Sequence, residues 1–303
     1  MASPLKVILS SKNNANESDV TASHIFLGYK PLVIGLIAND ADLLSDEICL
    51  SFVHGSFNSD TKWNGFSTDS RAVARILLKK VQQKDLDGQL IYLFEAWHAE
   101  HRLIGAFHQF VNNTREKFKT RGKDNVSLPG NLFDQVRIAY SVPRKISVVT
   151  VSDSTLVNMF PTDLHGAIGN SYYASSLRIG GRANAQVESL RRIVISDVDA
   201  SSYMEVYSMG KNHMMDLQNE GRFMLHHQRS RIFNFPLPEW ALRYKEMIHQ
   251  GSTDLGIHRI HFYRVINNRV LENAGPTLAH IQQYYAQWRM DQDLPTTLML
   301  RKG

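Results

Sequence analysis

The residues that could carry chemistry gather between Ile146 and Val198, where strand-like segments end in polar and cationic side chains. Two β-rich segments are followed by a Gly-Gly-Arg turn, a short helical pattern and a third strand. Glycines let the backbone approach a ligand closely, and the N–H groups that open a helix attract anions. This arrangement can hold an anionic cofactor without a nucleotide-binding glycine loop.

Positive charge is concentrated in the same part of the chain. The net charge of +5 and the pI near 9.2 invite a nucleic-acid-binding interpretation, but no block of Lys and Arg occurs. A local phosphate partner explains the surplus better than a long polyanion, because seven cations face three acids over residues 137–192. They are Arg137, Arg144, Lys145, Arg178, Arg182, Arg191 and Arg192, against Asp153, Asp163 and Glu188.

Length and composition favour a folded protein of one large or two ordinary domains. The 303 residues are 43% hydrophobic and 21% charged. The single Cys49 excludes an intrachain disulfide and favours a reducing compartment. No run approaches the ~20 apolar residues of a membrane-spanning helix, and the N-terminal apolar run is too short for a signal peptide. We therefore expect a cytoplasmic protein that binds neither membrane nor nucleic acid.

The first 130 residues alternate strand and helix signals, which predicts an α/β domain. The runs KPLVIGLIAND, EICLSFVHG and QLIYLFEAW are typical of buried strands. Helices are predicted over STDSRAVARILLKKVQQKD, with a cap at residues 67–69, and over HRLIGAFHQFVNNTREKF. The polar segment 120–131 is the best linker candidate, so we expect domains at 1–130 and 131–303.

Short strands dominate beyond the linker. They are VRIAYS, ISVVTVS, LVNMFPT, YYASSLR and RIVISDV, followed by the helix-like SSYMEVYSMGKNHMMDL. A strand pair is predicted around ALRYKEMIH and HRIHFYRVI, and the second of these has one apolar face and one mixed face, as in a barrel wall. A closing helix is predicted to carry Leu278, Ile281, Tyr285 and Trp288 on one side.

From about residue 134 to 270 the sequence resembles the flavin reductase-like, FMN-binding split-barrel family. AYSVPRKISVVTVSDSTLVN resembles the family's opening strand, turn and Asn-containing strand. YYASSLRIGGRANAQVESLRRIVISDV resembles the next strand, the phosphate-side turn, a helix and a further strand. LPEWALRYKEMIHQGSTDLGIHRIHFYRVI resembles the late segment that carries Gly-Asp-His. The resemblance implies a mainly β, α+β chain: an FMN-binding split β-barrel preceded by the α/β N-terminal domain.

The same resemblance implies a homodimer in which hydride passes from NAD(P)H through flavin N5 to a small-molecule redox substrate. A strand along the flavin, the Gly-Gly-Arg turn at its phosphate and a histidine on the nicotinamide side would form the site. The implied catalytic residue is His258, and the implied cofactor-binding residues are Asn158, Phe160, Thr162, Asp163, Arg178, Gly181, Arg182 and Asn184. The two arginines would neutralise the phosphate.

The sequence departs from the family pattern at three places, and the first two favour a second hypothesis, a non-catalytic flavin-binding or interaction module. Ile257 replaces the acid of Gly-Asp-His, Tyr263 replaces a small residue, and Pro161 interrupts the flavin strand. Each site residue also has a structural explanation: a simple glycine turn, solvated arginines, or a strand histidine with satisfied hydrogen bonds. Two E-x-x-H pairs occur outside long bundle helices, so no metal site is expected.

Overall fold

The chain is mostly β and divides into two compact units, each described here by itself. The computed structural model describes residues 5–11, 17–37, 45–54, 71–102, 104–118, 126–271, 275–291, 293 and 300–302. Unit 1 is Met1–Val142 with Gln282–Pro295, and unit 2 is Pro143–Ile281 with Thr296–Lys302. The division falls after Val142, beyond the linker candidate at 120–131, of which residues 120–125 lie outside the described residues.

Unit 1 contains a seven-stranded antiparallel sheet among its described residues, in the order β2-β1-β5-β6-β7-β4-β3. Its helices are α1 (Ala106–Phe118), α2 (Asn131–Ala139) and α5 (Gln283–Asp291). The predicted strand–helix alternation of an α/β domain is therefore wrong for this sheet. Its strands are β1 (Leu5–Ser11), β2 (Glu17–Asp19), β3 (His24–Tyr29), β4 (Leu32–Ile37), β5 (Glu47–His54), β6 (Ala72–Leu86) and β7 (Gln89–His101).

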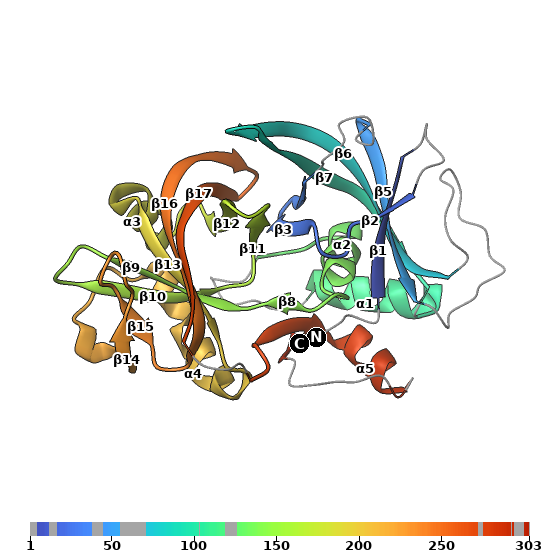
Figure 1. Ribbon diagram of the computed structural model, residues 1–303. Helices are drawn as coiled ribbons and strands as arrows, with labels where there is room; N and C mark the ends of the chain where they lie inside the picture. The colour runs from blue at the N-terminus through green and yellow to red at the C-terminus, as the bar shows by residue number, and fades with distance from the viewer. Residues whose placement is uncertain are drawn as a thin grey trace. The chain divides into compact units, whose positions relative to one another are not determined.

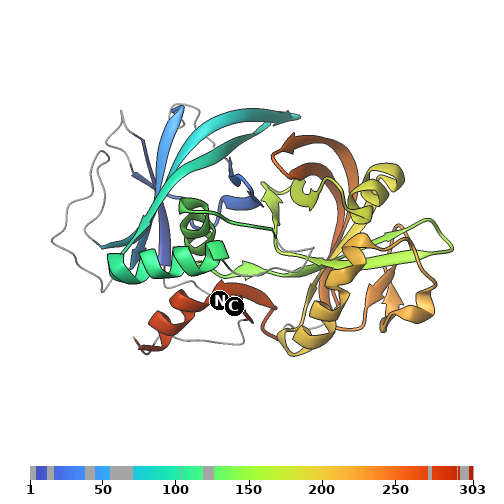
Figure 2. The ribbon, with the colours of Figure 1, turned by 180° about the vertical axis from the view of Figure 1, so that it is seen from behind.

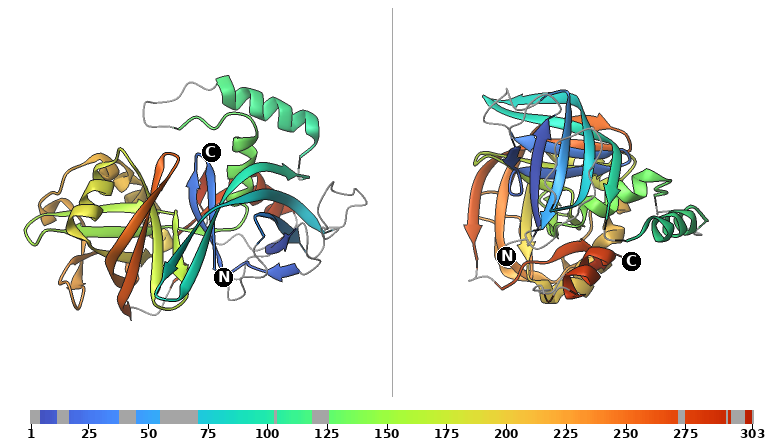
Figure 3. Two further views of the ribbon diagram at one scale, coloured as in Figure 1. Left: turned by 90° about the horizontal axis from the view of Figure 1, so that it is seen from above. Right: turned by 90° about the vertical axis from the view of Figure 1, so that its right-hand side faces the viewer.

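The helix predicted after residue 67 is wrong where the structure describes it, because β6 fills this segment. Residues 72–78 are all buried, so both faces of the strand are apolar and the helical spacing of its hydrophobic residues is coincidental. Asp87 and Gly88, with φ of 49° and 88°, form the turn into β7, as Asp-Gly pairs do in two-residue hairpins. Figure 3 shows β6 and β7 as one long twisted ribbon. The predicted cap at 67–69 lies outside the described residues.

The predicted strand VRIAYS is also wrong, because most of it lies in α2. Six consecutive residues of this helix, 134–139, are buried, and the helix packs on β7 of the unit 1 sheet (Figure 2). Asn131 fixes its start: its side chain accepts from Ala99 N and donates to Ala99 O, each at 2.8 Å. Tertiary burial therefore overrides the β-branched character of Val136 and Ile138.

Unit 2 is built on a second seven-stranded antiparallel sheet among the described residues, in the order β10-β9-β13-β16-β17-β12-β11. In Figure 1, β16 and β17 form a long, strongly curved hairpin. These strands confirm ISVVTVS, LVNMFPT, YYASSLR, RIVISDV and the late strand pair. Their bounds are β9 (Ser147–Ser152), β10 (Val157–Thr162), β11 (His165–Ile168), β12 (Tyr172–Arg178), β13 (Arg192–Val198), β16 (Ala241–Leu255) and β17 (His258–Val270).

Both faces of the unit 2 sheet are covered. On one face α3 (Arg182–Leu190) buries Ala183 and Val187 in a cluster with Val149, Ile195 and other sheet residues. On the other face α4 (Tyr203–Ser208) and the hairpin β14 (Leu225–Arg229)–β15 (Pro236–Pro238) contribute to two further clusters. Three short 3₁₀ segments accompany them: η2 (Ala200–Ser202), η3 (Met209–Met214) and η4 (Glu220–Arg222).

The closing helix begins later than predicted. α5 carries Tyr285 and Trp288, whereas Leu278 and Ile281 lie in or beside the strand β18 (Ala279–Gln282). This strand belongs to a three-stranded sheet with β8 (Arg144–Lys145) and β19 (Leu300–Lys302). No helix among the described residues is long and apolar enough to span a membrane.

Glu246 is a fully buried carboxylate that holds the loop before β15. Its oxygens accept from Phe233 N at 2.7 Å, from Ile232 N at 2.9 Å and from Asn267 Nδ2 at 2.6 Å. Charge-assisted bonds of this kind replace the hydration that the carboxylate loses on burial.

We expect Glu246→Ala to lower the free energy of unfolding by about 2–4 kcal/mol, because two backbone N–H groups and one amide lose their buried acceptor. Urea denaturation followed by circular dichroism measures the change. The exposed Glu239 provides the control, and Glu239→Ala should be neutral. Equal stability of the two variants would contradict the anchoring role of Glu246.

Candidate functional site

The predicted turn and the predicted histidine meet at one end of the unit 2 sheet. Arg178, the last residue of β12, is the register partner of His258, the first residue of β17. Ile179 N donates to Ile257 O at 3.1 Å, which ties the turn to the β16–β17 hairpin. Gly256 adopts a φ of +61° in that hairpin, a conformation that glycine adopts without strain. We call residues 178–182 the glycine corner.

The glycine corner leads directly into α3. Gly181 is the N-cap residue and has no side chain to accept from the first-turn N–H groups. Its own N–H donates to Arg178 O at 3.0 Å. A Cβ at this position would lie 3.3 Å from both Arg178 O and His213 O, which is tighter than ordinary contact. The corner therefore needs glycine for close packing, and the positive end of the α3 dipole opens there.

The two arginines of the glycine corner have different surroundings. Arg182 Nε lies 3.5 Å from Asp216 Oδ1, and both side chains are largely exposed, at 64% and 79%. An exposed pair of this kind contributes little to stability. Arg178 is half-buried, and its positive charge helps to lower the pKa of both His258 and His213, after the larger effect of burial.

The side chains of the predicted flavin strand, β10, are engaged within the protein. Asn158 is fully buried and donates to Gln186 Oε1 at 2.9 Å and to Asn212 O at 3.0 Å. Phe160 is fully buried in the cluster beneath α3. Thr162 Oγ1 accepts from Leu164 N at 3.3 Å. These contacts join β10 to α3 and η3, and they give the three side chains structural roles.

Asn184, in the first turn of α3, ends a buried hydrogen-bond chain. Its Nδ2 donates to Ile179 O at 3.3 Å, so its Oδ1 accepts from His261 Nε2 at 2.8 Å. In neutral His261 the other nitrogen then accepts from His249 Nε2 at 3.1 Å. The chain fixes the start of α3 against β16 and β17, because each partner has only one satisfactory donor–acceptor assignment.

Asp163 lies just after β10 and is ion-paired with His280. Its negative charge also acts on His258 and His213, since it opposes the lowering of the pKa of both imidazoles. Asp163 is therefore close enough to the glycine corner to share its electrostatics, and its role in cofactor binding stays a prediction. A carboxylate here partly balances the charge of Arg178.

His213 is a residue of this region that sequence reasoning missed. Its Nε2 donates to Pro161 O at 2.7 Å, its ring centroid lies 4.9 Å from that of Phe160, and burial lowers its pKa. It lies in η3, within the segment SSYMEVYSMGKNHMMDL that the sequence indicated only as helix-like. The sequence signal for its role is weak, because η3 approaches the site through tertiary contacts with β10 and α3.

His258 is neutral at physiological pH. Burial, and then the charge of Arg178, lower its pKa to about 4, while Asp163 opposes the shift. A neutral imidazole both donates and accepts a hydrogen bond but carries no positive charge. His258 therefore suits orientation of a polar group better than protonation of one near pH 7.

Together these residues form a candidate anion-binding site. Two arginines, the first-turn N–H groups of α3 and a close-packed glycine face the same end of the sheet, beside a neutral histidine. This set of hydrogen-bond donors fits a phosphate group, because a phosphate accepts several hydrogen bonds and its negative charge pairs with cations.

No protein-family model matches this sequence, and a search of curated proteins finds no relative. Solved structures do show a likeness in fold. An FMN-binding protein from Thermus thermophilus is 19% identical over 52% of this chain and 82% of its own, with a TM-score of 0.40. The NADH:FAD oxidoreductase of Streptomyces globisporus is 14% identical over 50% and 89%, with a TM-score of 0.41.

A third similar structure is the flavin reductase component of a bacterial two-component tryptophan halogenase. It is 14% identical over 46% of this chain and 88% of its own, with a TM-score of 0.41. Each of the three similarities covers about half of this chain.

The buried histidines predict how stability depends on pH. Burial lowers the pKa of His258 to about 4 and that of His261 to about 3, against about 6.5 in an unfolded chain. Between pH 6.5 and 4 the unfolded state binds more protons, so the free energy of unfolding falls as the pH falls. We expect a loss of about 1–2 kcal/mol per histidine between pH 7 and 5, measured by urea denaturation.

A matched pair of variants tests whether the buried histidines cause this loss of stability at low pH. His261→Gln removes one of the buried histidines with a lowered pKa and should reduce the pH dependence by that residue's share, whereas His227→Gln at an exposed position should leave it unchanged. Stability that is constant from pH 7 to 5 in the unaltered protein would contradict neutral burial of these rings.

Proposed function

We propose that unit 2 binds FMN, with the flavin phosphate at the glycine corner. The observation that carries this proposal is the register of β12 with β17, which brings Arg178, the start of α3 and His258 to one end of the sheet. These are the elements that the family resemblance assigns to the phosphate and to the nicotinamide side. The likeness in fold to flavin-binding structures is consistent with the assignment.

The residues of the corner would divide the phosphate contacts between them. First-turn N–H groups of α3 would donate hydrogen bonds, and Arg178 would supply the nearby charge. Arg182 would exchange its exposed partner Asp216 for the phosphate at small cost, because that pair is weak in water. Asn184 would hold the first turn of α3 in place through His261.

We further propose an NAD(P)H-dependent oxidoreductase of the flavin reductase type, with a split β-barrel in unit 2. Bound flavin would supply the hydride-accepting chemistry, and the protein would supply orientation and electrostatics. Neutral His258 would hydrogen-bond a polar group on the nicotinamide side without adding charge. A cytoplasmic homodimer that reduces a small-molecule acceptor completes this proposal.

A second candidate is a module that binds flavin without turnover. It is favoured by Tyr263, which is fully buried and shares a 3.0 Å hydrogen bond with Ser175 Oγ where the family has a small residue. The internal contacts of Asn158 and Phe160 favour it as well, because they leave fewer side chains of β10 for a flavin ring. In this version unit 1 would dock a partner.

We expect Arg178→Ala and Arg182→Ala each to weaken FMN binding by about 1–3 kcal/mol, which is the scale of one lost charge-assisted contact. Quenching of FMN fluorescence measures the dissociation constant. Arg222→Ala removes an exposed arginine from η4 and serves as the matched control. FMN affinity that is equal in all three variants would place the phosphate elsewhere.

Measurement of NAD(P)H oxidation distinguishes the flavin reductase from the module that binds flavin without turnover. Oxidation of NADH or NADPH, followed by absorbance with FMN present and absent, should be FMN-dependent for a reductase. Saturable FMN binding without oxidation of either nucleotide would support the binding module instead. In both cases the visible absorbance of the purified protein reports whether flavin copurifies.

A further inference from the structure

A second cationic group of unit 2 surrounds the carboxylate of Asp197, near the end of β13. Asp197 is 5% exposed, and its Oδ2 lies 2.8 Å from Lys145 Nζ and 3.5 Å from Arg243 Nε. Its Oδ1 accepts from Ser147 Oγ at 2.9 Å. The carboxylate is therefore fully satisfied, and it neutralises only one of the two cations that touch it.

The sheet register adds a third cation to the same face. Ser147, Asp197 and Arg243 are paired across β9, β13 and β16. Lys245 lies two residues beyond Arg243, so both side chains are on one face of β16. Its Nζ donates to Asn268 Oδ1 at 3.4 Å, which is a neutral partner.

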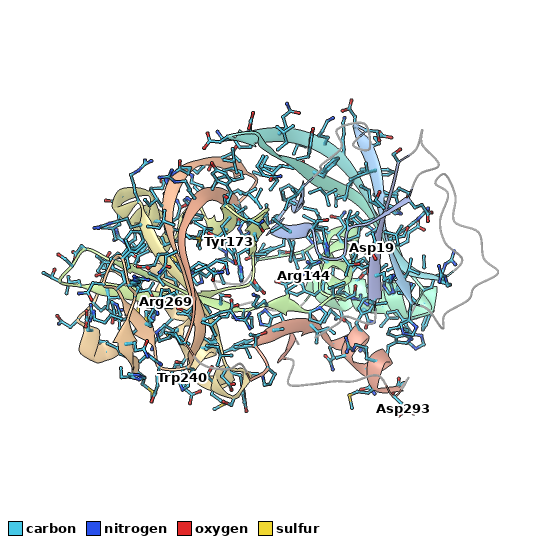
Figure 4. The ribbon with its side chains drawn as sticks, viewed as in Figure 1. Asp19, Arg144, Tyr173, Trp240, Arg269 and Asp293 are labelled. Atoms are coloured by element: carbon cyan, nitrogen blue, oxygen red, sulfur yellow. The ribbon has the colours of Figure 1, made fainter. Side chains whose placement is uncertain are left out.

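The neighbouring polar residues do not balance this charge. His165 Nε2 donates to Lys145 O at 3.1 Å, and its Nδ1 accepts from Tyr173 Oη at 2.6 Å. Burial and the charge of Lys145 lower the pKa of His165 to about 4, so this ring is neutral at pH 7. Burial together with Asp197 raises the pKa of Tyr173, which is therefore neutral as well. Figure 4 labels Tyr173 on β12.

Lys145 and Arg243 thus share the carboxylate of Asp197, and Lys245 lies on the same face of β16. The other acid that acts on His165, Asp163, is bonded to His280. Three cations around one carboxylate leave an excess of two positive charges. Burial, and the like charges of Lys145 and Arg243, lower the pKa of Lys245 against the opposing effect of Asp197. Lys145 and Arg243 are 43% and 38% exposed, so a small ion from solvent can reach them. An excess of two charges is what a doubly charged anion would neutralise.

We propose that Lys145, Arg243 and Lys245 form a binding site for a phosphate group, as inorganic phosphate or a small phosphate monoester. A guanidinium and two ammonium groups match the several acceptor oxygens of a phosphate. A single carboxylate ligand would neutralise only half of the excess charge, so the phosphate class fits better.

This phosphate site is separate from the glycine corner. Lys245 lies toward the start of β16 and pairs with Asn268. The glycine corner lies at the other end of the β16–β17 hairpin, where Leu255 and Arg178 both pair with His258. Arg269, the residue after Asn268, marks the Lys245 end of the hairpin in Figure 4. The inference does not depend on flavin binding at the corner, and either proposal can fail without the other.

The test is thermal unfolding of the full chain with increasing inorganic phosphate at constant ionic strength, maintained with sodium chloride. We expect the Tm to rise by about 2–4 °C when phosphate reaches about ten times its Kd. The rise should be lost in Lys245→Met, which keeps most of the unbranched side chain but removes the charge. It should persist in Lys79→Met, which alters an exposed lysine of β6.

A second measurement separates a ligand site from a structural role. Without phosphate, Lys245→Met should have a Tm equal to or above that of the unaltered protein, because the variant relieves repulsion among the cations. A phosphate response that persists in Lys245→Met but is lost in Arg178→Met would place phosphate only at the glycine corner and overturn the proposal. The proposal would also be overturned if phosphate raised the Tm of the unaltered protein and of Lys245→Met no more than sodium chloride does.

A parallel thermal-unfolding titration with phenyl phosphate distinguishes a phosphate monoester ligand from inorganic phosphate. A larger Lys245-dependent shift than with inorganic phosphate identifies a monoester ligand, and a smaller one identifies the free ion. Both results support the site, since both depend on Lys245.

Discussion

The backbone hydrogen bond from Ile179 N to Ile257 O is the contact on which the glycine corner depends. It holds the end of β12 beside the turn between β16 and β17, and so fixes Arg178 opposite His258. Arg259 strengthens the same junction, because it binds Asp254 on β16 at 2.5 Å and Glu188 on α3 at 2.6 Å. A strand end, a hairpin and a helix start are thereby joined into one rigid frame.

Buried polar contacts then position the start of α3. The chain from His249 through His261 to Asn184 crosses the covered face of the sheet without any charged member at neutral pH. A neutral chain avoids the cost of burying charge and still fixes direction, since His249 donates to His261 Nδ1 and His261 donates through Nε2 to Asn184. Two groups of cations of unit 2 lie at the glycine corner and around Asp197.

Sequence reasoning found the strands of unit 2 because short apolar runs between turn formers are typical of buried strands. It also found the glycine corner, since Gly-Gly between two arginines is a local signal. It was wrong for β6, where a strand buried on both faces shows no alternation and the apolar residues happened to follow a helical period. The Asp87-Gly88 turn was the available local signal for that hairpin.

Other features depend on tertiary contacts that no local pattern carries. The burial of α2 against β7 outweighs the strand-like composition of VRIAYS. His213 reaches the corner through η3, and Asn158 bonds to backbone oxygens more than 50 residues away in sequence. Sequence reasoning also missed the cations around Asp197. Lys145, Arg243 and Lys245 come together only through the pairing of β9, β13 and β16.

The most direct test of the central claim compares FMN with riboflavin, which differs only in lacking the phosphate. If the glycine corner holds that phosphate, FMN should bind at least about tenfold more tightly, a difference of about 1.4 kcal/mol. Fluorescence titration of both ligands against the full chain gives the two dissociation constants. Equal affinity for the two flavins, or binding of neither, would contradict the account.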